Sequence, residues 1–265
     1  MPLTWPDARH IYLSPHLDDA VLSCGGTIYE QAQAGEPVAV VTVFAASPPA
    51  DRPLSAFAGE LHARWRASAA ESGASFSDPV AVRRREDEHA MLALGANVRA
   101  VHLDLPDCIY RYASDTGEAL YASEEAIFGA VHPDDPALAE LSAVPALPEG
   151  STLYVPLAIG HHVDHQLVHH AVRGWKLPPG RVRYYEDYPY AVQQGEPVET
   201  MLARCGAWQP IVTPLSDRAL EAKIRAAAAY QSQISTFWQS REAMAEALRD
   251  YARQVGGERV WVPAG

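Results

Sequence analysis

A histidine and two aspartates stand close together near the start of the chain, in the stretch Ser14-Pro15-His16-Leu17-Asp18-Asp19-Ala20. The apolar run Ile11-Tyr12-Leu13 before it predicts a buried strand, and Pro15 prevents a helix from starting earlier. From Asp18 onward, apolar residues at helical intervals predict a helix with both carboxylates in its first turn. His16 then lies where a strand ends, which is where open parallel sheets bind ligands. The stretch therefore predicts a metal site with its own base.

The two aspartates are expected to have different roles. Adjacent side chains on a helical turn point roughly 100° apart. One carboxylate can therefore bind a cation together with His16, while the other faces the space above the metal. From there it can accept a proton from a water on the metal.

Five of the eleven histidines lie within ten residues, in the stretch Gly160-His161-His162-Val163-Asp164-His165-Gln166-Leu167-Val168-His169-His170. It follows a predicted strand over Ser151–Leu157, so both motifs should reach the same edge of a sheet. Two imidazoles and a carboxylate suit catalytic zinc and leave positions for water and substrate. His16, Asp19 and one histidine of the cluster would complete this set, with Asp18 as the base. A further histidine nearby could stabilise an oxyanion.

The spacing leaves open which histidine of the cluster binds the metal. His165 and His169 lie one turn apart on a helix face and could form an i,i+4 metal pair. Equally, His169 and His170 could be ordinary core or surface residues, which is the interpretation we favour for these two.

The composition bounds the class of protein. With 265 residues and 48% hydrophobic content, the chain can bury one large core. A net charge of -12 argues against a nucleic-acid or anionic-membrane partner, because such proteins usually carry a basic patch. The cysteines, which form no C-x-x-C pair, are expected to be buried thiols and are Cys24, Cys108 and Cys205. No signal-peptide pattern and no apolar stretch of ~20 residues is present, so we expect a cytoplasmic protein.

Strands alternating with helices predict an α/β fold: a Rossmann-like, mostly parallel sheet with helices on both faces and the active site at the C-terminal edge of the strands. Later strands are predicted at 38–44, 98–105, 151–157 and 181–186, with an edge strand at 259–262. Helices are predicted at 61–70, 80–94, 124–130, 163–175, 216–234 and 241–255. We expect one domain over 1–265, in which 106–150 is an insertion at the active-site edge. The charged run Arg83-Arg84-Arg85-Glu86-Asp87-Glu88 predicts a mostly solvated helix face laced with ion pairs.

At these positions the sequence resembles the PIG-L/LmbE-like family of zinc-dependent N-deacetylases of amino sugars. The first motif, followed by Cys24-Gly25-Gly26-Thr27, and the later His162-Val163-Asp164-His165 are similar to the two family signatures. The charged run with Ala90-x-x-x-Leu94-Gly95 resembles the intervening helix, and Tyr185–Tyr190 resembles a later aromatic-acidic segment. The first family motif more often reads His-Pro-Asp-Asp followed by Glu. Here Leu17 and Ala20 stand instead, which leaves the substrate subgroup open.

The resemblance implies a metal site and a base at named positions. His16, Asp19 and His165 would bind zinc, and Asp18 would be the general base. The same ligand set can hold iron, manganese or cobalt, so zinc rests mainly on the family.

The resemblance also implies further functional residues. His162 would be the electrophilic or oxyanion-stabilising histidine, and Asp164 its orienting partner. An arginine of the intervening helix contacts substrate in some members, and Arg83 is our choice among three. Asp107, at the end of the third strand, is a second substrate-binding candidate.

The sequence thus predicts a zinc hydrolase that removes an N-acyl group, in the first place acetyl, from an amino sugar such as a GlcNAc conjugate. Its partner would be that small molecule, and a homo-oligomer is compatible with the sequence. One alternative is a metal-dependent amidase or esterase acting on a non-sugar metabolite. Another is a nucleotide- or metal-binding module without catalysis. The module is disfavoured because Cys24-Gly25-Gly26 lies inside a predicted helix and not at its start, as a phosphate-binding glycine loop would.

Overall fold

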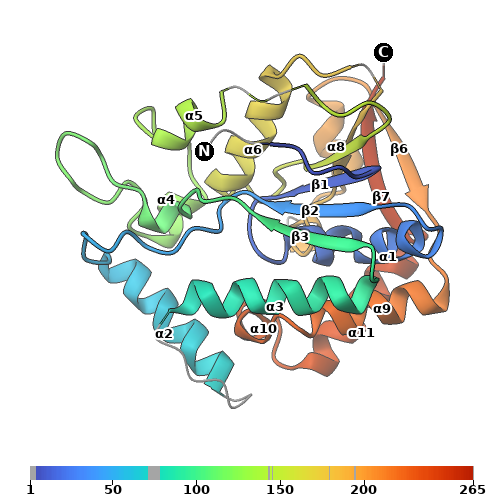
Figure 1. Cartoon of the computed structure of the whole chain (residues 1–265), viewed down its shortest axis with the longest axis horizontal. Coiled ribbons are helices and arrows are strands. Elements are labelled where there is room, and N and C mark those ends of the chain that lie inside the picture. Colours follow the sequence, from blue (N-terminus) through green and yellow to red (C-terminus); the bar gives the residue numbers. More distant parts are fainter. Residues whose placement is uncertain are drawn as a thin grey trace.

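The computed structural model describes residues 4–70, 78–142, 144, 146–178, 180–193 and 195–264. Within these ranges a seven-stranded sheet runs in the order β3-β2-β1-β4-β5-β7-β6 (Figure 1). The strands are β1 (His10–Ser14), β2 (Val38–Thr42), β3 (Val98–His102), β4 (Thr152–Pro156), β5 (Val182–Tyr185), β6 (Trp208–Thr213) and β7 (Glu258–Pro263). Strands from both ends of the described chain join this one sheet.

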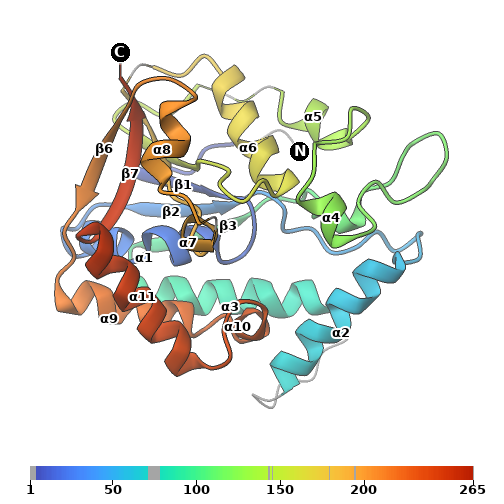
Figure 2. The same ribbon diagram turned by 180° about the vertical axis from the view of Figure 1, so that it is seen from behind.

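Helices cover both faces of the sheet, and Figure 2 shows the two layers from behind. On one face lie α1 (Asp19–Gln33), α3 (Pro79–Leu94), α9 (Asp217–Ala227), α10 (Gln231–Phe237) and α11 (Arg241–Val255). On the other lie α5 (Pro136–Glu140), α6 (Val163–Gly174) and α8 (Val198–Ala203). The remaining helices are α2 (Ala56–Ala70), the 3-10 turn η1 (Cys108–Tyr110), α4 (Glu124–Ile127) and α7 (Tyr190–Gln193). None of the described helices is long and apolar enough to cross a membrane.

The strands β3, β2, β1, β4 and β5 are parallel neighbours, which confirms the predicted Rossmann-like α/β fold. All five residues of β2 are buried, as expected of a β-branched strand covered on both faces. Because these strands are parallel, their carboxyl ends reach one edge of the sheet. The loops that follow β1, β3, β4 and β5 therefore meet there.

The C-terminal part of the sheet differs from the prediction. β7 is not an edge strand: it runs antiparallel between β5 and β6. No pattern in the residues of β6 indicated a strand, because they include Pro210 and show no apolar alternation; in the structure they are mostly exposed. The helix expected over 216–234 is two helices, α9 and α10, and α5, α7 and α8 were not predicted. Cys205 is exposed, against expectation, whereas Cys24 and Cys108 are buried.

The prediction of a mostly solvated charged run on α3 is wrong for half of its residues. Arg83, Glu86 and Asp87 are buried. Glu86 accepts hydrogen bonds from the backbone N–H of Ser232 at 2.9 Å and from its hydroxyl at 2.5 Å. Asp87 accepts one from the Tyr230 hydroxyl at 2.6 Å. These partners come from the α9–α10 region, so a helix viewed alone could not reveal that this face would be covered.

The helix that begins at the first motif is fixed from behind by a buried ion pair. Glu258 lies 2.7 Å from the Lys223 ammonium and also accepts the backbone N–H groups of Gly26 and Thr27. A Cβ on Gly26 would stand 2.5 Å from a methyl carbon of Leu215, so a larger residue here would force the Leu215 side chain to shift. The Gly25-Gly26 pair is thus a packing feature of α1.

We predict that Glu258→Gln lowers the free energy of unfolding by about 3–5 kcal/mol, because the buried Lys223 ammonium loses its counter-charge. Urea denaturation followed by circular dichroism measures this. The matched control is Glu221→Gln, which breaks an exposed pair with Arg249 and should cost less than about 1 kcal/mol. Equal losses in the two variants would contradict the assignment.

Candidate active site

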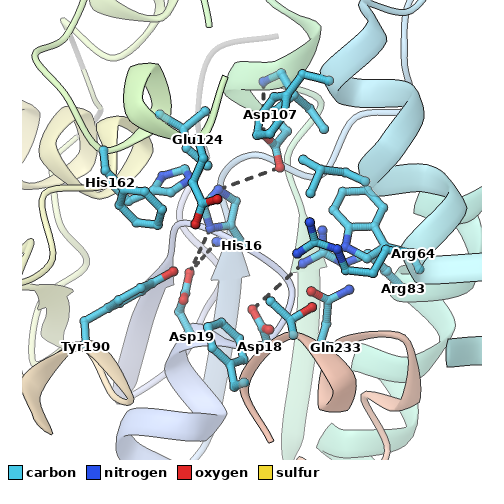
Figure 3. A pocket seen from close by; sticks show the side chains of 18 of the residues that line it. His16, Asp18, Asp19, Arg64, Arg83, Asp107, Glu124, His162, Tyr190 and Gln233 are labelled. Atoms are coloured by element: carbon cyan, nitrogen blue, oxygen red, sulfur yellow. Dashed lines mark hydrogen bonds and ion pairs between the residues drawn. The ribbon is translucent and has the colours of Figure 1, made fainter. Parts of the chain in front are cut away.

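A cavity opens at the carboxyl edge of the parallel strands, and Figure 3 shows the side chains that point into it. The β1–α1 loop and the first turn of α1 supply His16, Asp18 and Asp19, and the start of α6 supplies His162. Further lining residues come from other elements and include Trp65, Arg83, Asp107, Glu124, Phe128, Tyr190, Gln233 and Phe237. The predicted residues Asp164 and His165 are fully buried and contact the lining side chains from behind. All eight predicted site residues therefore lie in one cluster.

Three side-chain atoms converge as metal ligands would. One carboxylate oxygen of Asp19, Oδ2, lies 3.3 Å from His16 Nδ1 and 3.3 Å from His165 Nε2. Two ligands each about 2.0–2.1 Å from a tetrahedral zinc ion stand about 3.3 Å apart. His165 Nε2 is buried and has no hydrogen-bond partner among the described residues. This open nitrogen fits a metal ligand.

The other nitrogen of each histidine is held by a carboxylate. His16 Nε2 lies 2.9 Å from Asp164 Oδ2, and His165 Nδ1 lies 2.6 Å from Asp187 Oδ1. Such outer carboxylates fix the tautomer and orientation of a metal-binding imidazole and raise its basicity. His16 and His165 are therefore oriented toward the shared oxygen of Asp19.

The charges around these histidines favour a cation. Burial alone would lower the pKa of His165, but the Asp19 and Asp187 carboxylates outweigh it and raise that pKa to about 9. Burial likewise opposes protonation of His16, yet its bonds to Asp164 and Asp19 raise its pKa well above the usual value. Burial would raise the pKa of Asp19, but the two histidines hold it well below its ordinary range. The cluster thus stabilises positive charge at the point where the ligand atoms meet.

Asp18 occupies a different environment from its neighbour Asp19. Its side chain makes no capping hydrogen bond at the start of α1, although it stands at the capping position. Burial, and then the charge of Asp19, raise the pKa of Asp18 to about 7, while Arg83, 3.9 Å away, opposes the rise. A carboxylate with such a pKa in a cavity can exchange protons near neutral pH.

His162 caps α6 and borders the cavity. Its Nδ1 accepts the backbone N–H of Asp164, and burial, reinforced by the charge of His16, lowers the pKa of His162 well below 6.5. The ring is therefore neutral, with its hydrogen on Nε2. Nitrogens of His16, His162 and His165 lie within 4.8 Å of one another, so His162 stands beside the candidate metal position.

The structure gives Asp164 a partner that the sequence did not suggest. Its carboxylate bonds to His16 and, at 2.5 Å, to Arg111, whereas its link to His162 is the backbone N–H. Arg111 is buried, also pairs with Asp135 at 3.0 Å, and its guanidinium lies over the Phe44 ring. Arg111 holds the pKa of Asp164 below its ordinary value against the effect of burial. The expected orienting partner of His162 is thus a support for His16.

The two predicted substrate-binding residues line the cavity. Of the three arginines considered, Arg83 points into it, whereas Arg84 bonds to the carbonyl of Ala45 and Arg85 is exposed. The Asp107 carboxylate accepts the backbone N–H of Ile109 and lies 3.7 Å from His16 Nε2.

The predicted insertion 106–150 supplies lining residues at the cavity edge and includes Asp107, Ile109, Glu124 and Phe128. Its positions 143 and 145 lie outside the described residues, as do positions 71–77 beside the helix predicted at 61–70.

The remaining histidines of the second motif lie away from the ligand atoms. His169 Nδ1 donates to the carbonyl oxygen of Pro156 and its ring packs on Tyr184, and His170 is exposed. The i,i+4 alternative of His165 with His169 is therefore not supported among the described residues.

Several residues that build the site were not predicted. Asp187 follows the end of β5, within the segment Tyr185–Tyr190 that resembles a family motif, but the sequence analysis assigned it no role. Other residues of the site lie where only the fold decides their position: Arg111 in an irregular segment, and Tyr190 and Gln233 on α7 and α10.

A family model described as GlcNAc-PI de-N-acetylase, PIG-L, matches residues 11–176. The chain belongs to the PIG-L family. It is therefore an N-deacetylase, a hydrolase of amide bonds, as the sequence predicted. A 2'-N-acetylparomamine deacetylase of Streptomyces fradiae is 31% identical to this PIG-L protein over 97% of this chain and 90% of that protein.

Solved structures of PIG-L deacetylases share the fold. A zinc-inhibited form of the teicoplanin deacetylase Orf2 is 29% identical, with a TM-score of 0.72 over 95% of this chain and 96% of that one. The A40926 pseudoaglycone deacetylase is 27% identical, with a TM-score of 0.65 over 97% of this chain and 96% of that one.

We predict that Asp187→Asn weakens zinc binding by about 10- to 100-fold, because the carboxylate that orients His165 is lost while the bond from the Ile159 N–H can be kept. Competition with a chromophoric chelator measures the affinity. Asp115→Asn, on an exposed turn, is the matched control and should bind zinc as the wild type does. Unchanged affinity in Asp187→Asn would show that His165 is not a ligand.

Proposed function

We propose that this PIG-L protein is a metal-dependent hydrolase that removes the acetyl group from an N-acetylated amino sugar within a conjugate. One observation supports this above the others. The buried His165 Nε2, which lacks a hydrogen-bond partner among the described residues, meets Asp19 beside His16, while Asp18 lines the same cavity outside that set. A ligand set and a separate base are what amide hydrolysis requires.

His16 Nδ1, Asp19 Oδ2 and His165 Nε2 would hold the metal, with zinc as our first candidate. A divalent ion at this place would polarise the amide carbonyl and lower the pKa of a water. Three protein ligands leave room for both, and the surrounding carboxylates favour positive charge.

Asp18 and His162 carry the proton chemistry in this proposal. Asp18 accepts the proton of the attacking water, since its pKa of about 7 lets it act near neutral pH. The neutral His162 ring offers its Nε2–H to the oxygen on which negative charge develops. Asp18, once protonated, can then deliver that proton to the leaving amine, and His162 is the alternative donor. Arg111, through Asp164, keeps His16 oriented throughout.

The sugar would lie against the polar and aromatic lining of the cavity. Arg83 and Asp107 offer a donor and an acceptor for hydroxyl groups, while Trp65 and Phe237 present apolar rings suited to the faces of a sugar. The relative from Streptomyces fradiae is named for 2'-N-acetylparomamine, which supports an amino-sugar conjugate as the substrate class.

We expect Asp18→Asn to lower kcat by about 10²- to 10⁴-fold while the protein keeps its metal, because the variant loses the base but none of the three ligands. Amine release from N-acetylglucosamine and a panel of its conjugates measures the rate, and elemental analysis measures the metal. His165→Ala is the comparison and should lose metal and activity together.

Two results would contradict this proposal. Full activity of Asp18→Asn would remove Asp18 as the base. Metal-loaded wild-type protein that releases amine from no member of the panel would remove the amino sugar as the substrate.

A further inference from the structure

A glutamine from the C-terminal part of the chain projects into the cavity beside the proposed base. Gln233 lies on α10, outside the segment that the family model matches, and is only 6% exposed. Figure 3 shows its amide next to Arg83 and Asp18, with the oxygen on the cavity side. A buried amide in this position must have a partner, or a substrate group must supply one.

A chain of hydrogen bonds fixes which end of the amide faces the cavity. The Ser232 hydroxyl donates its single hydrogen to Glu86 at 2.5 Å, so toward Gln233 it can only accept. The Gln233 nitrogen Nε2 donates to that hydroxyl oxygen at 3.0 Å. The amide oxygen Oε1 is therefore directed away from Ser232 and toward the cavity (Figure 3).

The series of hydrogen bonds that holds Gln233 begins at a fixed residue. Glu86 is a buried residue of α3, and it also accepts the backbone N–H of Ser232 at 2.9 Å. The glutamine is thus tied to the same helix that carries Arg83, so the two side chains keep a fixed relation. Preorganised polar groups of this kind give specificity because they cannot turn to suit a different ligand.

Arg83 presents an unused donor beside this acceptor. Its Nε is buried and has no hydrogen-bond partner in the described part of the chain. Its guanidinium lies over the Trp65 ring at 4.7 Å from the centroid and reaches Asp18 only at 3.9 Å. A fixed acceptor and a fixed donor therefore stand side by side at the cavity wall.

We propose that Gln233 is a specificity-determining residue that accepts a hydrogen bond from a ring hydroxyl of the amino sugar, while Arg83 donates to the same oxygen. This inference rests on the proposed function. A hydroxyl is the substituent that can both donate and accept. A carboxylate or phosphate group would face the Gln233 oxygen without a hydrogen to share, and an ammonium group would be repelled by Arg83.

The test is a cross of enzyme variants with substrates. Gln233→Leu is compared with wild type on the preferred N-acetyl sugar and on analogues in which each ring hydroxyl in turn is replaced by hydrogen. We expect kcat/KM of Gln233→Leu to fall by about 10- to 100-fold on the full sugar, mainly through KM. On the one analogue that lacks the matching hydroxyl, wild type and variant should be equal.

Two controls separate recognition from structure. Gln193→Leu makes the same change at the exposed rim of the cavity, and its kcat/KM should differ from that of wild type by the same factor on every analogue. Calorimetry can measure binding of the same sugars to Asp18→Asn and to Asp18→Asn/Gln233→Leu without turnover. The Kd values should differ between the two proteins on the full sugar and agree on the analogue that lacks the matching hydroxyl.

Different results would overturn the role of Gln233 and the proposed deacetylase function. Suppose wild type is active and kcat/KM of Gln233→Leu falls by the same factor on every analogue, or does not fall. Gln233 then binds no particular hydroxyl, and the inference is overturned while the proposed function stands. If wild type turns over no N-acetyl sugar and Asp18→Asn binds none, both are overturned.

Discussion

The Asp19 carboxylate, shared by the cavity-lining His16 and the fully buried His165, is the constraint around which the rest of the structure is arranged. His16 comes from the loop after β1 and His165 from the first turn of α6, about 150 residues later, and each brings one nitrogen to the same oxygen. Burying that cluster is costly unless each polar group has a partner or a metal. Asp164 and Asp187 meet this need on the far side of the two rings. They leave the inner nitrogens free for a ligand.

A second layer holds this arrangement in place. Arg111, buried between Asp164 and Asp135, keeps the Asp164 carboxylate charged and oriented. On the opposite side of α1, the Lys223–Glu258 pair fixes the helix that carries the two aspartates. Arg111 and the Lys223–Glu258 pair come from segments distant in sequence from the two motifs. The chemistry of the site therefore depends on segments whose sequences carry no catalytic pattern.

The cavity above the proposed metal position is shaped by later elements. α10 packs against α2 and α3 and brings Gln233 and Phe237 to the wall opposite His162. The first motif and α6 are the parts common to the family signatures, whereas α10 lies beyond the matched segment. The same deacetylase chemistry can therefore serve different conjugates through changes in these walls.

The sequence by itself determined the parallel core and the chemical cluster. Short-range signals suffice for these: a β-branched run marks β2, and apolar runs mark β1 and β4. Polar residues at the ends of parallel strands must meet at one edge because these strands share a direction. The exposed strand β6, the interior position of β7 and the break between α9 and α10 gave no such signal.

Only the tertiary structure decided which partners the charged side chains have. Arg83, Glu86 and Asp87 fit a solvated helix by their spacing, yet they are buried because the α9–α10 region covers them. Arg111 and Gln233 acquire their roles the same way, from neighbours far away in the chain. The helical spacing of residues indicates which side chains share a face, but the packing of the whole fold decides which element covers that face.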